Sequence, residues 1–208
     1  MAAQARRTSV KKYNDAYAAE KDFVARPNAF LARCLRWIGP GGARRRALDI
    51  GVGQGRNAVL LAQRGYHTTG IDRSEVGVAA ARRLAARRGV KIRAILADTD
   101  DFDFGRNRWD LVLLLYYPQP MVLMRRLKAA VRPGGHLVVE RFSRPTCARG
   151  AHAVDRRETR RPSPMLECLV DWHILHYENS EFESDWHWDG ESPRGPIVRV
   201  LARRPRRP

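Results

Sequence analysis

Apolar positions along the chain follow two different periods, and together they predict an alternation of strands and helices. Short apolar runs bounded by glycine, proline or charged residues are typical of strands. The predicted strands are Ala47–Ile50, His67–Ile71, Val90–Leu96, Trp109–Tyr116, His136–Arg141, Trp172–Glu178 and Ile197–Arg203. Helical spacing predicts a helix that opens at Asn57 and further helices over Glu75–Arg88, Met121–Ala130 and Pro164–Val170. This order of elements indicates an α/β fold with a mostly parallel sheet.

Two of these elements support more detailed predictions. In helix Glu75–Arg88, we expect Val76, Ala80 and Leu84 to face the core. The run Trp109–Tyr116 is apolar throughout, as expected of a central parallel strand that is buried on both faces.

A helical lead-in is predicted over Lys11–Leu35, and Pro27-Asn28 interrupts it. After this break, four residues recur at helical spacing, namely Phe30, Leu31, Cys34 and Leu35. Whether this lead-in packs into the core or covers a ligand site is left open by the sequence.

The stretch Ala47–Asp72 combines a strand, a glycine turn, a helix and a second strand. Glycine has no Cβ, so the turn that holds Gly51, Gly53 and Gly55 can adopt positive φ and let a ligand approach the backbone. The helix N-terminus that follows favours an anionic group. Asp72 ends the second strand, where a carboxylate can accept hydrogen bonds from both hydroxyls of a ribose. The stretch therefore predicts a site for a nucleoside-containing cofactor.

The glycine spacing narrows the choice of cofactor. The glycines run G-x-G-x-G, whereas a dinucleotide fingerprint is G-x-G-x-x-G, and Arg56-Asn57 is not the Lys-Ser or Lys-Thr of a phosphate-binding loop. The pattern D-x-G-x-G-x-G, which begins at Asp49, resembles the first motif of the class I S-adenosylmethionine (SAM)-dependent methyltransferases. The run L-x-x-x-V-R-P-G-G-H-L-V-V, which ends at Val139, is similar to a helix–turn–strand of the same family.

Three further features narrow the resemblance to small bacterial methyltransferases of the tellurite-resistance and thiopurine methyltransferase type. They are Gln54–Asn57 followed by an apolar helix, the run from Pro27 to Leu31, and Arg194-Gly195-Pro196 before the last strand. The resemblance spans residues 13–205 and implies a Rossmann-like fold. In that fold, helices cover both faces of a seven-stranded, mostly parallel sheet whose last strand is antiparallel.

The resemblance also implies a cofactor shell for SAM and its product S-adenosylhomocysteine. The residues at the matching positions are Asp49, Gly51, Gly53, Gly55 and Asn57 around the methionine part, Asp72 and Arg73 at the ribose and the adenine edge, Asp98 and Thr99 at the adenine, and Leu115 and Tyr116 near the sulfonium. In this family, N-terminal helices often cover the cofactor.

The expected function is methyl transfer from SAM to a small-molecule nucleophile by in-line displacement, with a thiol or chalcogen-type acceptor favoured because a soft anion needs no base. Four residues could lie near the expected pocket, namely Tyr116, Tyr117, Glu140 and His187. None of them is part of a sequence motif for a catalytic role, so the catalytic residues are unknown. The alternatives are an RNA or protein methyltransferase and a SAM-binding module without turnover.

Composition bounds the domain organisation. The 208 residues suit one domain, predicted at 13–203, with a basic flexible N-terminus at 1–12, a mobile lid loop at 143–163 and a basic tail at 204–208. No apolar run approaches the ~20 residues of a membrane span, and no secretory signal is recognised, so a cytoplasmic protein is expected. Cys34, Cys147 and Cys168 form no CxxC pair, which predicts neither a disulfide framework nor a metal site.

The formal net charge of +17 would suit nucleic-acid binding. The basic residues are nearly all arginine and are spread along the sequence without interleaved aromatics, so a generally arginine-rich surface is favoured over a nucleic-acid site. The oligomeric state is not predicted.

Overall fold

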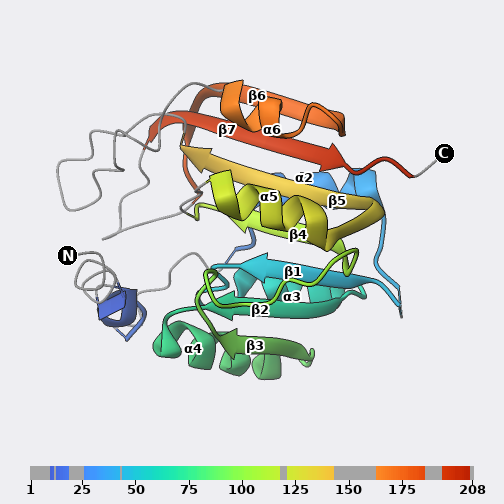
Figure 1. Cartoon of the computed structure of the whole chain (residues 1–208). Coiled ribbons are helices and arrows are strands. Elements are labelled where there is room, and N and C mark those ends of the chain that lie inside the picture. Colours follow the sequence, from blue (N-terminus) through green and yellow to red (C-terminus); the bar gives the residue numbers. More distant parts are fainter. Residues whose placement is uncertain are drawn as a thin grey trace.

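A computed structural model describes residues 10–11, 13–18, 26–42, 44–117, 121–142, 163–185 and 194–206. The described strands form one seven-stranded sheet in the order β3-β2-β1-β4-β5-β7-β6 (Figure 1). The strands are β1 Arg46–Ile50, β2 His67–Asp72, β3 Ile92–Leu96, β4 Trp109–Leu115, β5 Val131–Phe142, β6 His173–Glu183 and β7 Arg194–Arg203. The helices are α2 Ala29–Ile38, α3 Arg56–Gln63, α4 Glu75–Arg87, α5 Met121–Ala130 and α6 Ser163–Cys168.

The sheet has the predicted mixture of strand directions. Strands β1 to β5 run parallel to one another, whereas β7 is antiparallel to both of its neighbours, β5 and β6. The parallel strands therefore all end at one edge of the sheet, which we call the carboxyl edge, and begin at the opposite, amino edge. In Figure 1 the carboxyl edge is on the left.

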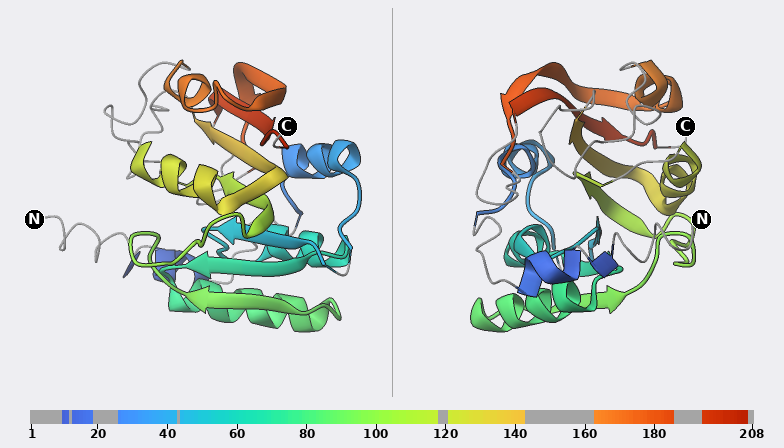
Figure 2. Two further views of the ribbon diagram at one scale, coloured as in Figure 1. Left: turned by 45° about the vertical axis from the view of Figure 1, so that its right-hand side comes forward. Right: turned by 90° about the vertical axis from the view of Figure 1, so that its left-hand side faces the viewer.

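Helices cover both faces of this sheet, α2, α3 and α4 on one side and α5 and α6 on the other (Figure 2). Strand β4 is buried along its whole length because helices pack against both of its faces. Leu111 and Leu113 belong to the cluster with α2 and α3, while Val112 and Leu114 pack with α5. The continuous apolar run is thus explained by a two-sided core.

The predicted inner face of α4 was wrong by about one residue. Ala81 and Ala85 are buried together with Gly77 and Val78, while the expected Val76, Ala80 and Leu84 are only partly buried. The reason is the close approach of α3 and α4. A Cβ built on Gly55 would lie 2.8 Å from the Cβ of Ala81, so only the small residues of α4 fit there.

The predicted turn before β5 is present as an irregularity inside the strand. Trp109 pairs with Val131 and Leu111 with His136, so the chain bulges between these pairs, and Gly134 has a φ of 79°. The residue after β7 holds this bulge in place, because the Gly134 N–H donates to the carbonyl of Arg204 at 2.9 Å.

The described part of the N-terminal lead-in is helical at residues 10–11 and 13–18 and again in α2. All four residues expected on the inner side of α2 are buried, and Asn28 caps the helix. Most of the expected lid loop, residues 143–162, lies outside the described residues, as do Cys147 and His187. In the described chain, no helix is long and apolar enough to cross a membrane.

Candidate functional site

The glycine turn after β1 lies at the carboxyl edge and is held in place by β2. Gly51, Gly53 and Gly55 have φ values of 73°, 50° and 88°, which explains the glycines because other residues rarely adopt this region. The N–H of Gly51 donates to the carbonyl of Ile71 at 2.9 Å. The N–H of Gly53 donates to Asp72 Oδ2 at 2.8 Å. The acid at the end of β2 therefore fixes the turn that follows β1.

Asp72 is also bonded to the start of the next segment, since its Oδ1 accepts from the N–H of Ser74 at 2.9 Å. Burial raises the pKa of Asp72, and the hydrogen bonds from Ser74 and Gly53 oppose that shift. The structure thus places Asp72 beside the glycine turn, as the sequence predicted. A carboxylate has about four lone-pair directions, so two backbone bonds leave acceptor capacity for a ligand.

Two tyrosines form walls around the glycine turn. A Cβ built on Gly51 would lie 2.7 Å from the ring of Tyr117, and one built on Gly53 would lie 2.9 Å from the hydroxyl of Tyr17. Tyr17 belongs to the helical residues 13–18, which therefore cover the turn. The same segment contacts the start of α4, where Ser74 Oγ donates to Asn14 Oδ1 at 2.5 Å. The two alternatives left open by the sequence therefore both apply: residues 13–18 cover the candidate site, whereas α2 packs into the core.

The ends of β2, β3 and β4 are joined by polar contacts. Arg73 Nη1 lies 3.5 Å from Asp98 Oδ2. Thr99 Oγ1 and the hydroxyl of Tyr117 are 3.1 Å apart, and Arg126 from α5 donates to the carbonyl of Thr99 at 2.5 Å. The predicted adenine-side residues are therefore brought to the same edge as Asp72.

Asp49, which lies next to the last residue of β1 at the carboxyl edge, is 2% exposed. Its Oδ2 has no hydrogen-bond partner among the described residues. Burial is the largest cause that raises the pKa of Asp49, to about 7; the nearby Asp72 raises it further, and Arg56 and the Ala58 N–H lower it. A buried carboxylate oxygen without a donor is costly, so this atom is a candidate ligand contact.

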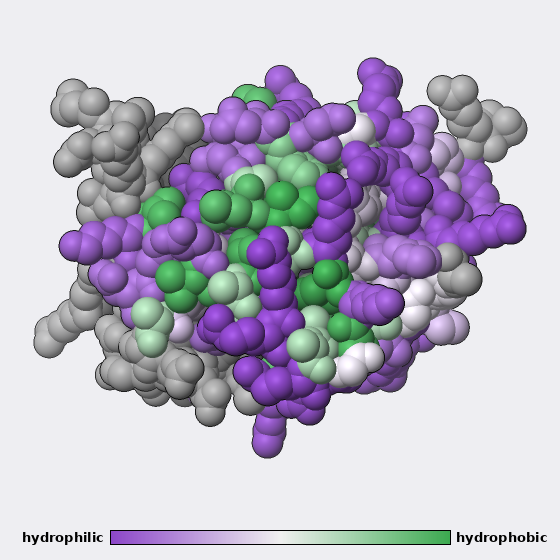
Figure 3. Space-filling view, turned by 90° about the horizontal axis from the view of Figure 1, so that it is seen from below, coloured by the Kyte–Doolittle hydropathy of each residue, from purple (hydrophilic) through white to green (hydrophobic). Residues whose placement is uncertain are grey.

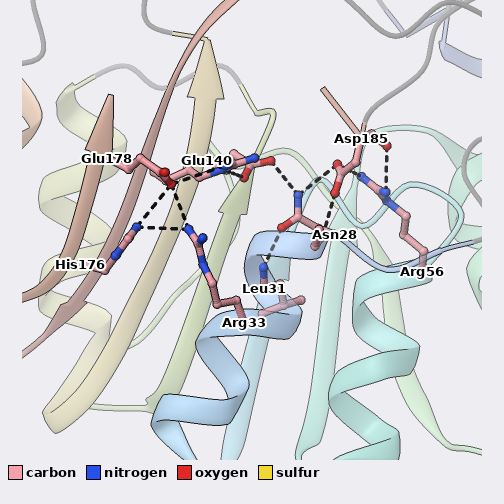
Figure 4. A network of polar contacts seen from close by, with 10 residues as sticks. Asn28, Leu31, Arg33, Arg56, Glu140, His176, Glu178 and Asp185 are labelled. Carbon is pink, nitrogen blue, oxygen red and sulfur yellow. Dashed lines mark hydrogen bonds and ion pairs between the residues drawn. The ribbon is translucent and has the colours of Figure 1, made fainter. Parts of the chain in front are cut away.

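Asn57 connects the first turn of α3 to the N-terminus of α2. Its Oδ1 accepts from the N–H of Asn28 at 2.9 Å. The side chain of Asn28 then donates to Glu140 Oε1 at 2.8 Å, while its Oδ1 accepts from the N–H of Leu31 (Figure 4). Arg199 Nε donates to the other oxygen of Glu140 at 2.6 Å. Asn28 and Glu140 are fully buried, so this is an interior network.

Arg56 extends this network to the segment after β6. Its Nη2 lies 3.2 Å from Asp185 Oδ1, and its Nη1 donates to the carbonyls of Asp185 and Arg26. Asp185 Oδ2 in turn accepts from the N–H of Ala29 at 2.8 Å (Figure 4). The start of the glycine-turn helix is therefore tied to both α2 and the β6–β7 connection.

Tyr116 turns the chain sharply at the end of β4, with a φ of 53°. Burial raises its pKa well above the usual range, and the neighbouring Glu140 carboxylate adds to this. Leu115, just before it, is 8% exposed. Both predicted residues thus reach the carboxyl edge, with the Tyr116 ring 5.4 Å from that of Phe142.

The structure therefore brings all the sequence-predicted site residues to one edge of the sheet. It adds residues that the sequence analysis did not select for the site, namely Tyr13, Tyr17, Asn28, Arg56, Asp185 and Arg199. The run from Pro27 to Leu31 and the Gln54–Asn57 run did contain a signal for two of them. Within the described residues, no group of three potential metal-ligating side chains lies together.

Comparison with known proteins agrees with this geometry. Residues 47–135 match a family model described as a methyltransferase domain. The ubiquinone biosynthesis O-methyltransferase of Alkalilimnicola ehrlichii is 34% identical over 122 residues, which are 55% of this chain and 47% of that protein. The chain thus spans about half the length of this curated relative.

Two solved structures share the fold. TehB from Haemophilus influenzae has a TM-score of 0.68 and 20% identity, over 84% of this chain and 61% of that chain. A structure titled "Conversion of a Disulfide Bond into a Thioacetal Group during Echinomycin Biosynthesis" has a TM-score of 0.72 and 21% identity, over 95% of this chain and 92% of that chain.

Proposed function

We propose that the chain is a class I SAM-dependent methyltransferase that transfers the methyl group of SAM to a small-molecule nucleophile; the match of residues 47–135 to a methyltransferase domain supports this. One observation carries this proposal. The glycine turn after β1 and the acid at the end of β2 are joined by the bond from the Gly53 N–H to Asp72, so the two expected cofactor contacts form one unit at the carboxyl edge.

The residues present fit SAM. Its methionine part carries an ammonium group, and the unpartnered Oδ2 of the buried Asp49 is suited to accept from a cation. The glycine turn lacks the Cβ atoms that would occupy its surface, and Asp72 retains acceptor capacity for ribose hydroxyls. Thr99 and Asp98 would contact the adenine, and Tyr17 and Tyr117 would enclose the cofactor.

The bound cofactor supplies a methyl group on a sulfonium, which an aligned nucleophile displaces. The protein then has to position the acceptor and exclude water. The tyrosine walls and the segment at residues 13–18 suit both tasks, because they cover the edge where the reaction would occur.

The acceptor is inferred from the state of the titratable groups at this edge. Glu140 is fully buried with both oxygens bonded, and burial raises the pKa of Tyr116 and of Tyr117, so they are protonated at neutral pH. Asp98 is paired with Arg73. With Asp49 and Asp72 assigned to the cofactor, none of these four groups is suited to act as a general base. An acceptor that reacts as an anion, such as a thiolate or another chalcogenide, needs none.

A cofactor-binding experiment tests the first part of the proposal. Calorimetry with SAM and with S-adenosylhomocysteine should detect binding to the wild type and weaker binding, by about 1–3 kcal/mol, to Asp72→Ala. Asp101→Ala removes an exposed acid near the same edge and should leave the affinity unchanged. Absence of binding to the wild type would overturn the proposal, and the same loss in both variants would remove the role of Asp72.

A matched pair of acceptors tests the second part. Thiophenol and phenol share a ring and differ in the attacking atom, so methylation of thiophenol alone is expected. Its rate should follow the ionisation of the thiol rather than that of a protein group. Equal methylation of phenol would contradict the inference on the missing base. Methylation of RNA or of a protein in place of both would favour the macromolecular alternative, and binding without any transfer would favour a SAM-binding module.

A further inference from the structure

The fold gathers basic side chains at the amino edge of the sheet, opposite the candidate site. The parallel strands begin there, and helices α3, α4 and α5 end there, so each connection between a helix and the next strand passes this edge. The basic residues of these connections form what we call the arginine edge: Arg44, Arg45, Arg46, Arg64, Arg87, Arg88, Lys91, Arg106, Arg108, Arg132, Arg203, Arg204 and Arg206.

These residues are distant in sequence but close in the fold. The N–H of His67 donates to the carbonyl of Arg45 at 2.8 Å, which joins the segments before β1 and β2. His136 pairs with Arg203, so the end of β7 lies beside the start of the regular part of β5. In Figure 1 this edge is on the right, with the C-terminus beside it.

Few acids balance this charge. In the described segments 44–46, 64–67, 87–91, 106–110, 131–136, 171–173 and 203–206, the acids are Asp110 and Asp171. Asp110 pairs with Arg132 at 2.9 Å, and Asp171 pairs with Lys128. Within the described chain, no salt bridge is found for Arg46, Arg64 or Arg88, and all three are exposed. Their guanidinium groups therefore remain available to an external anion.

The acids of the described chain concentrate at the other edge. Asp49, Asp72 and Asp98 follow or end the strands on the side of the candidate site. The described part of the chain is thus polarised, positive at the amino edge and richer in carboxylates at the carboxyl edge. Among the described residues, those of the amino edge attract a polyanion more strongly than those of the carboxyl edge.

We propose that the arginine edge binds the phosphate backbone of nucleic acid without reading its sequence. Guanidinium groups donate two parallel hydrogen bonds to a phosphate, and strands about 4.8 Å apart spread this row from β3 to β7 over about 24 Å, a large part of the ~34 Å of one duplex turn. The aromatic residues of the edge segments, Tyr66, Trp109 and Trp172, are 4%, 2% and 7% exposed, so none offers a platform for stacked bases.

An anionic membrane is the less suited partner. Surface helices and loops that bind membranes add inserted apolar side chains to their basic residues. The exposed large apolar side chains of the described chain lie outside the edge segments; in sequence, Val170 and Ile174 flank the segment at Asp171, and Trp37 lies four residues before Gly41, whose N–H donates to the carbonyl of Arg64. Seen from below, the right-hand margin of the molecule is hydrophilic, and the apolar surface gathers toward the middle (Figure 3).

The two sites have different roles under this proposal. Because the arginine edge lies at the end of the sheet opposite the glycine turn, a duplex bound there does not present its bases to the candidate site. Nucleic acid is then a docking partner and not the methyl acceptor.

A triple variant tests this surface. Arg46→Gln, Arg64→Gln and Arg88→Gln together should weaken binding to a random-sequence 20-base-pair DNA at least about tenfold, measured by fluorescence anisotropy at several salt concentrations. The slope of log K against log[salt] should fall by up to about three, near one for each lost phosphate contact. SAM binding should be unchanged, which shows that the variant is folded.

The matched control removes the same charge elsewhere. Arg83→Gln, Arg93→Gln and Arg125→Gln lie on exposed mid-element positions of α4, β3 and α5, and together they should change the affinity by less than about threefold. Equal weakening by both triples would show that net charge alone attracts the DNA and would overturn the proposal. So would absence of DNA binding by the wild type, or binding to vesicles of phosphatidylserine and phosphatidylcholine in its place.

Discussion

The carboxylate of Glu140 and the side-chain amide of Asn28 are hydrogen-bonded at 2.8 Å, and both residues are fully buried. This bond joins the centre of the sheet to the cap of α2. Since Asn28 also donates to Asn57 of α3 and to Asp185, the bond connects the walls of the candidate site through the interior. The geometry of the glycine-turn helix therefore depends on residues far from it in sequence.

Glu140→Gln is expected to destabilise the protein by about 1.5–3 kcal/mol, because the largely buried guanidinium of Arg199 loses the nearer of its two carboxylates and keeps only Glu178, at 3.5 Å. Urea denaturation measures the loss. Glu181→Gln, at an exposed position of β6, should cost less than about 0.5 kcal/mol. A loss below about 1 kcal/mol for Glu140→Gln would mean that the ion pair contributes little.

Two substitutions of Asn28 distinguish the stabilising effect of the helix cap from the effect of an added buried charge: Asn28→Ala and Asn28→Asp. The alanine variant loses the cap on Leu31 and the bonds to Glu140 and Asp185, so a cost of about 2–4 kcal/mol is expected. The aspartate variant keeps a cap but places a third carboxylate between two others. Its new carboxyl group would have a raised pKa, so its stability should fall as the pH rises above about 4. A pH-independent difference from the wild type would contradict this.

The parts of the fold that follow from neighbouring residues were predictable. The glycine turn and Asp72 form one βαβ unit, whose geometry depends on local backbone rules, and the sequence placed them correctly. The inner face of α4 was not predictable, because it is set by the fit of Ala81 against Gly55, the N-cap residue of α3. Asn28 and Glu140 are separated by 112 residues, so their partnership had no local signal.

The clustering of arginines at the amino edge could not be predicted from the sequence either. Along the sequence they are scattered, and that pattern favours a general basic surface. The order of strands and helices then decides that Arg64 and Arg88 each follow a helix, on the same edge as Arg46. Topology, not spacing, concentrates the charge.

Gly55→Ala should destabilise the protein more than Gly89→Ala. Both glycines have positive φ, 88° and 65°, so each substitution carries a backbone cost of about 1–2 kcal/mol. Only the Cβ at Gly55 meets a neighbour, at 2.8 Å from the Cβ of Ala81, whereas that at Gly89 meets nothing within 4 Å. Overpacking should add about 1–3 kcal/mol at Gly55. Thermal or urea denaturation measures both, and equal losses would mean that α3 and α4 separate easily.

Asp49→Asn should change how stability depends on pH. Burial raises the pKa of Asp49 to about 7, so between about pH 4 and 7 the folded chain holds a proton that the unfolded chain releases. Wild-type stability therefore falls as the pH rises through this window, and the amide variant should escape that loss. Its gain should be small at pH 4 and on the order of 4 kcal/mol at pH 8. Urea denaturation at several pH values measures it, with the exposed Asp101→Asn as control. Parallel pH profiles for Asp49→Asn and the wild type would show that Asp49 is ionised in the folded chain throughout.

The Asp49→Asn variant should also bind SAM more weakly, because the amide can no longer offer a charged oxygen to the ammonium group. A protein that is more stable yet a poorer binder would identify Asp49 as a residue kept for its ligand and not for the fold.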